Sequence, residues 1–241
     1  MELSTHEETG APGPPSKDAA REARDLARAA VRLDAPAVQE RLAAAVRTHG
    51  PAGAWEDVMV PALRAVGRRW ESSGDRYVEV EHLLTWHVSA TLRHAYVSAA
   101  GHAPPAAVSP VLLACVPGEQ HALPLEALNA ALAERHVPAV SLGGAVPSEA
   151  LTAAVRRVGP RSVVLWSQSW PTANLPLARH IATTCGEAGG GRTRGRVLLG
   201  GPGWGTRPGP GLLRPRHLAE ALRLITAPDG PDPDPAAPAG S

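Results

Sequence analysis

The hydrophobic period of the chain changes near residue 100, and this change restricts the fold more than any other feature. Before the stretch 101–109 (GHAPPAAVS), apolar residues recur at the helical spacing of three and four. After it, short β-rich runs alternate with helical patterns. The stretch itself is rich in Pro, Gly and Ala, so we expect a linker between a helical domain, 17–100, and an α/β domain, 110–226.

The first domain is predicted to contain four helices, at about 17–33, 36–48, 51–70 and 80–96. The third helix carries one continuous apolar stripe formed by Trp55, Val58, Met59, Ala62, Leu63, Val66 and Trp70. Pro61 interrupts this stripe, and we expect it to cost a hydrogen bond and to bend the helix. Four helices joined by short links predict an antiparallel bundle.

The second domain is predicted to be a parallel α/β sheet with right-handed crossovers. Its predicted strands are 111–116, 137–142, 162–166 and 196–199, and each is followed by a helical pattern. Ligands of such sheets bind at the carboxyl ends of the strands. The loops that we expect at this edge are 117–121, 143–147, 167–171 and 200–204.

Composition and charge argue against nucleic-acid binding, export and membrane insertion. A formal net charge of +1 gives no field that would attract nucleic acid. The N-terminus is acidic and polar, unlike a signal peptide, and no apolar run approaches the roughly 20 residues of a membrane helix. Two cysteines without metal-type spacing indicate reduced thiols. We expect a cytoplasmic protein with no direct DNA binding and no membrane span, and disorder in 1–16 and 227–241.

His121 is the residue best placed to meet a ligand, because it lies in the first of the four loops, inside Gly118-Glu119-Gln120-His121. An imidazole with a pKa of about 6.5 is mostly neutral near pH 7 and can coordinate a metal through one ring nitrogen. Glu119 could accept the N–H of the other ring nitrogen and fix the tautomer. The alternative is a surface histidine beside an unrelated acid, and the tetrapeptide alone leaves both interpretations open.

Several motifs together resemble a known family. The segment PGEQHALPLEALNAALAERHVPAVSLGGAVP, a later serine pair and a Gly-Gly turn are similar to a flavodoxin-like (Rossmann-type) cobalamin-binding domain of the base-off, His-on type. This resemblance implies that His121 is the lower ligand of cobalt and that Glu119 supports it. It implies a slot for the displaced nucleotide tail, lined by Ser167, Ser169, Gly200 and Gly201. The other cofactor-binding positions that it implies are Gly118, Gln120, Leu142, Gly143 and Pro202.

The helical domain resembles the four-helix cap of the CarH/LitR (MerR-type) light-responsive regulators, in the segment WEDVMVPALRAVGRRWESSGDRYVEVEHLL. These regulators carry a Trp, a spacer of nine residues and then Glu-His, which corresponds here to Trp70, Glu81 and His82. Trp70 ends one antiparallel helix and Glu81 begins the next, so we expect both at the same end of the bundle. The resemblance implies that these three residues cover the upper face of an adenosylcobalamin.

The chain departs from the family pattern at several positions. Pro124 stands where the family has a glycine, and Ser169 replaces the usual leucine. Ten residues separate Trp70 from Glu81, one more than in the pattern. Glu71 stands where the best-known light sensors have a histidine that captures cobalt after illumination.

The resemblance implies a cobalamin-binding sensor, responsive to light, that is not an enzyme. It would act in transcription regulation through a DNA-binding partner or through self-association, because we expect the MerR-type DNA-binding domain to be absent. One alternative is a corrinoid carrier protein of a methyltransferase system. Another is a degenerate domain that binds no corrinoid and serves as a protein-interaction module, an interpretation that Pro124 keeps open.

Overall fold

The computed structural model describes residues 16–73, 78–100, 109–188, 195–205, 209 and 211–227, without the side chains of 69–73, 100 and 188. The segments predicted as disordered tails and as a linker lie almost entirely outside these ranges. The described chain divides into two compact units. One unit comprises the residues up to His49 and from Gly53 to His87, and the other comprises Gly50–Ala52 and the residues from Val88 onward.

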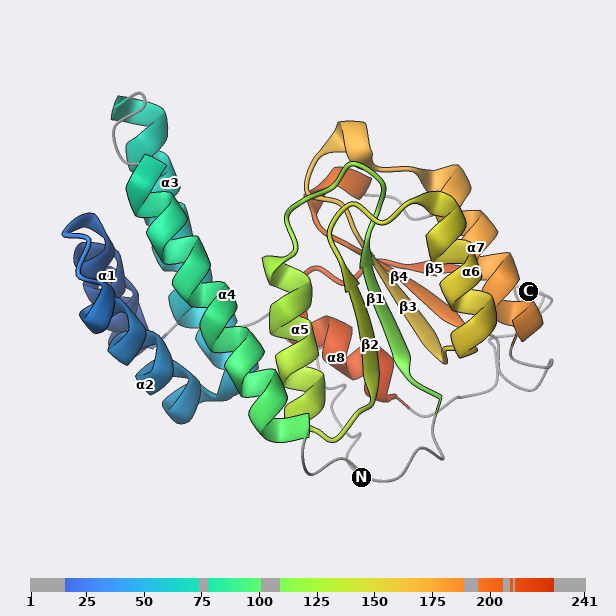
Figure 1. The fold of residues 1–241 in the computed structure, drawn as a ribbon, viewed down its shortest axis with the longest axis horizontal. Helices are drawn as coiled ribbons and strands as arrows, with labels where there is room; N and C mark the ends of the chain where they lie inside the picture. Colours follow the sequence, from blue (N-terminus) through green and yellow to red (C-terminus); the bar gives the residue numbers. More distant parts are fainter. Residues whose placement is uncertain are drawn as a thin grey trace, which may run out of the picture. The chain divides into compact units, whose positions relative to one another are not determined.

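The helices predicted for the N-terminal part are present (Figure 1). They are α1 (Lys17–Val31), α2 (Ala35–Gly53), α3 (Val60–Ser73) and α4 (Val78–Ala100). Ser16 caps α1 by accepting a hydrogen bond from the N–H of Ala19 at 3.1 Å. Fully buried apolar side chains, including Leu26 of α1, Leu42 of α2 and Leu84 of α4, form the core of the helical unit. The four predicted helices are confirmed.

The chain around Pro61 differs from a simple bent helix. A π-helical segment, η1 (Ala54–Met59), precedes α3, and Pro61 is the second residue of α3. The N–H of Val60 bonds to the carbonyl of Trp55, five residues back. A proline cannot donate to the preceding turn, and π turns are one of the identifiable sources of helix irregularity. The irregularity therefore lies one turn earlier than the sequence predicts.

The α/β part contains a five-stranded parallel sheet with the strand order β2-β1-β3-β4-β5. The strands are β1 (Val111–Cys115), β2 (Ala139–Gly143), β3 (Ser162–Trp166), β4 (Arg196–Gly200) and β5 (Leu212–Leu213). Cys115, Trp166 and Gly200 are Cα partners across β1, β3 and β4. These strands therefore end at one level, and the loops that follow them start side by side.

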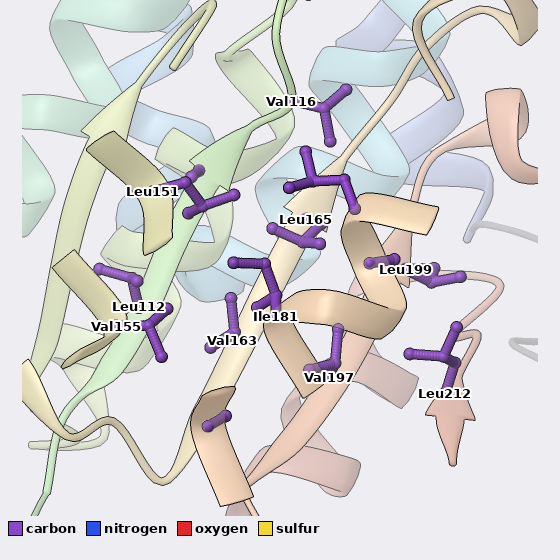
Figure 2. Packing of buried hydrophobic residues seen from close by; sticks show 14 of the residues in the cluster. Leu112, Val116, Leu151, Val155, Val163, Leu165, Ile181, Val197, Leu199 and Leu212 are labelled. Atoms are coloured by element: carbon purple, nitrogen blue, oxygen red, sulfur yellow. The ribbon is translucent and has the colours of Figure 1, made fainter. Parts of the chain in front are cut away.

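Four longer helices cover the two faces of this sheet: α5 (Leu123–Glu134), α6 (Ser148–Val158), α7 (Leu175–Ala188) and α8 (Leu218–Thr226). Figure 1 shows α6 and α7 on one face and α5 and α8 on the other. Leu112, Leu165 and Leu199 of the strands pack against Leu151 of α6 and Ile181 of α7, and all five are fully buried (Figure 2). The predicted flavodoxin-like, Rossmann-type class is confirmed, and β5 is an additional edge strand.

The second half of α4 belongs to the same unit as the sheet. Arg93 donates to the carboxylate of Glu126 in α5 from both Nε, at 3.1 Å, and Nη2, at 2.7 Å. The Glu126 side chain is only 13% exposed, and its second oxygen has no partner among the described residues. Gly50 also lies against α5, since a Cβ on it would be 2.8 Å from Oε1 of Glu134.

In the part of the chain that is described, no helix is long and apolar enough to span a bilayer.

Candidate corrinoid-binding site

His121 lies in the loop between β1 and α5, at the carboxyl edge of the sheet, and its side chain is 68% exposed. The loop begins with a tight turn in which Gly118 has a φ of +78° and Glu119 N–H bonds to the carbonyl of Val116. Only glycine adopts such a φ without cost. Below the loop, the thiol of Cys115 lies 3.8 Å from the carbonyl oxygen of His121. The local turn thus presents the imidazole outward while its backbone stays fixed.

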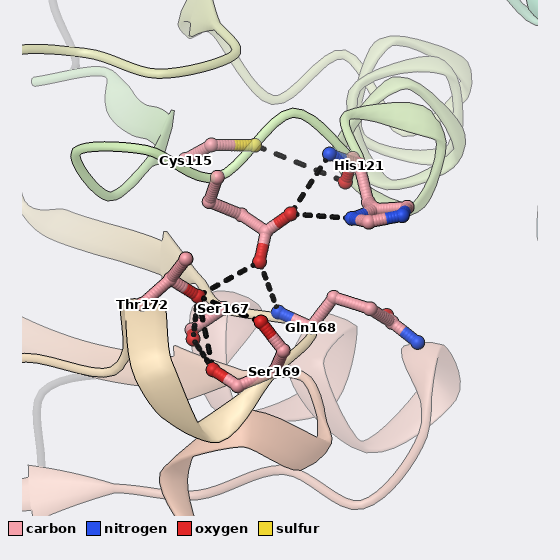
Figure 3. Close-up of polar contacts among 7 residues, drawn as sticks. Cys115, His121, Ser167, Gln168, Ser169 and Thr172 are labelled. Atoms are coloured by element: carbon pink, nitrogen blue, oxygen red, sulfur yellow. Dashed lines mark hydrogen bonds and ion pairs between the residues drawn. The ribbon is translucent and has the colours of Figure 1, made fainter.

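Glu119, in contrast, is buried and only 1% exposed. Figure 3 shows its binding partners His121, Gln168 and Thr172, with their polar contacts as dashed lines. Its Oε1 accepts from the backbone N–H of His121 at 2.9 Å and lies 2.5 Å from Nδ1 of the same residue. Its Oε2 accepts from the N–H of Gln168 at 2.7 Å and from the hydroxyl of Thr172 at 2.9 Å. The buried carboxylate therefore joins the first loop to the loop after β3.

These contacts determine the charge of Glu119. Burial by itself raises the pKa of this carboxyl, because a charged group is poorly solvated inside a protein. The hydrogen bonds from its donors outweigh burial and lower the pKa from 4.5 to about 2. Glu119 is therefore ionised throughout the physiological range and can only accept hydrogen bonds.

An ionised Glu119 fixes the tautomer of His121. Nδ1 must carry the proton that it shares with the carboxylate, so in the neutral ring Nε2 holds the free lone pair. The described residues give Nε2 no hydrogen-bond partner. A carboxylate behind an imidazole orients the ring and raises its basicity, which is the usual arrangement for a histidine that binds a metal.

The loop after β3 is held by hydroxyl groups. Ser167 is fully buried, and its Oγ lies 3.0 Å from the carbonyl oxygen of Ser169 and 2.8 Å from Oγ1 of Thr172. Ser169 is exposed, with its Oγ 3.5 Å from Oγ1 of Thr172. Of the predicted serine pair, only Ser169 therefore presents its side chain at the surface in this structure.

The loop after β4 packs closely on the loop after β3. The N–H of Gly203 donates to the carbonyl of Ser167 at 3.0 Å. Gly201 has a φ of +96°, and a Cβ there would lie 2.3 Å from the same carbonyl oxygen. No other residue fits this approach. Gly200 ends β4, and Pro202 begins the short 3-10 turn η3 (Pro202–Trp204) with an exposed side chain.

The loop after β2 joins the first loop from the other side. The N–H of Ala145 donates to the carbonyl of Glu119 at 2.7 Å, and a Cβ on Gly144 would lie 3.1 Å from Oε1 of Gln120. Leu142 is 38% exposed, and Gly143 has a φ of +78°. The structure thus gathers all predicted site residues of the α/β domain along one edge of the sheet.

The predicted cap residues lie on two helices of the helical part. Trp70 and Glu71 are in the last turn of α3, and their side chains are outside the described residues. Glu81 and His82 follow the start of α4 and have exposed side chains. Within the described residues, neither of these two side chains makes a hydrogen bond or an ion pair.

Sequence reasoning did not identify Thr172 or the backbone of Gln168, although both hold Glu119. Thr172 lies in the 3-10 turn η2 (Trp170–Thr172), and no spacing rule separates it from other hydroxyl residues near strand ends. Pro124, in contrast, lies in the first turn of α5, where backbone N–H groups have no partner within the helix. The proline is therefore compatible with the helix that begins after His121.

The donor set of this edge fits a corrinoid: one exposed imidazole whose Nε2 has no partner among the described residues, and a buried carboxylate that orients it. Comparison with known proteins finds similarity to cobalamin-binding proteins in part of the chain. Residues 22–96 match the family model of the B12 binding domain. The predicted resemblance to a cobalamin-binding module is confirmed by this match.

A particular relative is the HTH-type transcriptional repressor CarH of Myxococcus xanthus. The two sequences are 39% identical over 134 residues, which is 55% of this chain and 42% of the repressor. The matched region thus covers less than half of that relative's length. Among solved structures, the monomethylamine corrinoid protein of Methanosarcina barkeri has a TM-score of 0.60 at 15% identity. This likeness spans 85% of the present chain and 96% of that protein, and it concerns the fold.

Proposed function

We propose that this chain is a cobalamin-dependent sensor that acts in transcriptional regulation and that His121 is the lower ligand of the cobalt. The observation that carries the proposal is the His121–Glu119 pair. The imidazole is exposed at the sheet edge, its Nδ1 faces an ionised carboxylate at 2.5 Å, and its Nε2 has no partner among the described residues. The match of residues 22–96 to the B12 binding domain supports the same ligand from an independent part of the chain.

In this proposal Glu119 is a positioning residue. It keeps the proton on Nδ1, and the hydroxyl of Thr172 and the N–H of Gln168 keep the carboxylate in place. Because these groups are already ordered, little rearrangement is needed when Nε2 takes up its ligand. Gly118 and Gly143 supply the turns of the first two loops, while Gln120 and Leu142 present exposed side chains beside them.

The remaining proposed contacts follow from the family resemblance. Ser169, Gly200, Gly201 and Pro202, with Ser167 behind them, would line the slot for the nucleotide tail. Trp70, Glu81 and His82 would face the upper ligand, for which adenosylcobalamin is our choice. Adenosylcobalamin supplies a cobalt–carbon bond that visible light breaks. Glu81 and His82 are exposed and could hydrogen-bond an adenosyl group.

The regulatory role rests on the similarity to a transcriptional repressor. We propose that binding, rather than catalysis, is the activity of this chain, and that it acts through a DNA-binding partner or a change in self-association. A ligand present at 100 times its Kd that binds only one of two states stabilises that state by about 2.7 kcal/mol, which is enough to shift such an equilibrium. We place the protein in the cytoplasm.

A corrinoid carrier protein for a methyltransferase is the alternative, because the fold is shared with a monomethylamine corrinoid protein. The two functions differ in the upper ligand that they need. A carrier must hold a methyl group and expose it to other proteins, whereas the sensor must hold adenosylcobalamin and change state in light. Preference for methylcobalamin with no response to light would favour the carrier.

The test is a titration of the purified chain with adenosylcobalamin and methylcobalamin in the dark, followed by absorption spectra and by sizing before and after green light. His121→Ala should weaken cobalamin binding at least about 100-fold and remove the spectral change of imidazole ligation. His180→Ala, an exposed histidine on α7, is the matched control and should bind as the wild type. Unchanged affinity and spectrum in His121→Ala would overturn the proposal.

A further inference from the structure

Trp166, the last residue of β3, carries a buried donor that is not satisfied. Its Nε1 is fully buried and has no hydrogen-bond partner among the described residues, although the residue as a whole is partly exposed. Buried N–H groups are nearly always paired, because leaving one unpaired is costly. Trp204 shows the usual outcome in the same region, since its Nε1 donates to the carbonyl of Gly200 at 2.9 Å. The packing of the described residues therefore gives the N–H of Trp166 no acceptor.

The indole lies directly beside the turn that follows β4. A Cβ on Gly200 would be 2.9 Å from Cε3 of Trp166, and a Cβ on Gly201 would be 3.1 Å from its Cε2. Cε2 is the ring carbon bonded to Nε1, so the edge of the ring that carries the N–H is next to Gly201. Any side chain at these two glycines would be driven into the indole. The glycine turn and the indole thus form one structural feature at the ligand edge of the sheet.

The strand geometry places this feature close to His121. Trp166 is the Cα partner of Cys115, and the thiol of Cys115 contacts the carbonyl of His121. Trp166 also lies on the sheet face opposite Leu165, which packs against α6 and α7. The ring therefore belongs to the face that α5 and α8 cover, below the loop that carries His121.

We propose that the N–H of Trp166 donates a hydrogen bond to the nucleotide portion of a bound cobalamin and makes the site selective for corrinoids that have this portion. This inference rests on the proposed function. An indole N–H can only donate, and the nucleotide portion carries suitable acceptors: phosphate oxygens, ribose oxygens and a base nitrogen. The nitrogen is covered in this structure, so an acceptor would have to displace the groups around it.

The experiment compares two corrinoids in the complete chain. Cobinamide lacks the nucleotide, whereas hydroxocobalamin carries it, and the ratio of their dissociation constants isolates contacts to that portion. Trp166→Phe keeps an aromatic ring and removes the N–H. We expect it to weaken hydroxocobalamin binding about fivefold and to leave cobinamide binding unchanged. Trp86→Phe, at an indole that is 67% exposed on α4, should leave the ratio as in the wild type.

A second measurement needs no variant. In protein labelled with ¹⁵N-tryptophan, the indole N–H resonance of Trp166 should shift on addition of hydroxocobalamin and stay in place on addition of cobinamide. A wild-type ratio in Trp166→Phe, or a resonance that responds equally to both corrinoids, would overturn the inference and leave the proposed function standing. Failure of the wild type to bind either corrinoid would overturn both.

Discussion

The two parts of the molecule hold their predicted ligand-binding residues in different ways. In the α/β part, His121 is fixed by Glu119, and Glu119 is fixed in turn by groups from a second loop. In the helical part, Glu81 and His82 are exposed and make no polar contact with described residues. The α/β residues are therefore ordered before a ligand binds, whereas the two helical residues can rearrange around the ligand.

Within the proposed function, we infer that this difference gives the two parts different tasks. A preorganised imidazole suits permanent retention of a cofactor, because no ordering cost has to be met on binding. Solvated side chains suit a contact that forms and is lost again as the ligand changes. We therefore expect substitutions in the α/β part to change whether cobalamin is held, and substitutions in the helical part to change the response to it.

Glycine-to-alanine substitutions should give the largest difference between the two parts. We expect the free energy of unfolding to fall in the α/β part and to rise in the helical part. Gly201→Ala combines a φ of +96° with a Cβ 2.3 Å from the carbonyl oxygen of Ser167. We therefore expect it to lower the free energy of unfolding by about 3 kcal/mol or more. Gly67→Ala, inside α3 with open space around it, should stabilise by up to about 1 kcal/mol. Urea unfolding followed by circular dichroism measures both.

Gly143→Ala separates the two causes of the expected loss at Gly201. Gly143 has a φ of +78°, but nothing lies within 4 Å of a Cβ there. Backbone strain alone should lower the free energy of unfolding of this variant by about 1 kcal/mol. If Gly201→Ala were no less stable than Gly143→Ala, close packing of the two loops would not be the reason for the glycine.

The second contrast concerns the two acids that flank the predicted ligand. Glu119→Gln removes the charge that fixes the His121 tautomer and should weaken cobalamin binding about 10- to 100-fold. Glu81→Gln changes a solvated group and should alter the affinity in the dark less than about threefold. Equal losses in the two titrations would show that preorganisation does not distinguish the two parts.

The smallest effect tests the link between loops. Thr172→Val removes one of the hydrogen bonds to Oε2 of Glu119 and leaves the N–H of Gln168 in place. We expect cobalamin affinity to fall about two- to tenfold. Thr152→Val removes a hydroxyl that donates to Ser148 within α6 and is the matched control. An affinity loss shared by both variants would point to general destabilisation.

The sequence predicts the regular elements well wherever a period extends over several residues. The strand 162–166 is found with the predicted limits, and each predicted helix is present, because burial on one face imposes a readable pattern. The strand β5 has two residues, too few to show any period. The π-helical segment before Pro61 preserves the apolar stripe, so the pattern alone does not reveal it.

The site is predictable to the extent that its residues are close in sequence. Glu119 and His121 are two positions apart, and their contact could be inferred from the loop alone. Thr172 reaches Glu119 from 53 residues away. Such a contact depends on β1 and β3 being neighbours with level ends, a fact of strand order that local patterns do not contain. Whether Ser167 faces inward or outward depends in the same way on the packing of the next loop.

The pairing of Arg93 with Glu126 matters for anyone who wishes to dissect the chain. A fragment cut in the stretch 101–109 would begin after α4 and lose the guanidinium. The Glu126 carboxylate is largely buried, and one of its oxygens has no partner among the described residues, so it would then have to be rehydrated or protonated. A fragment that starts near Val88 keeps this ion pair and is the better choice for studying the sheet in isolation.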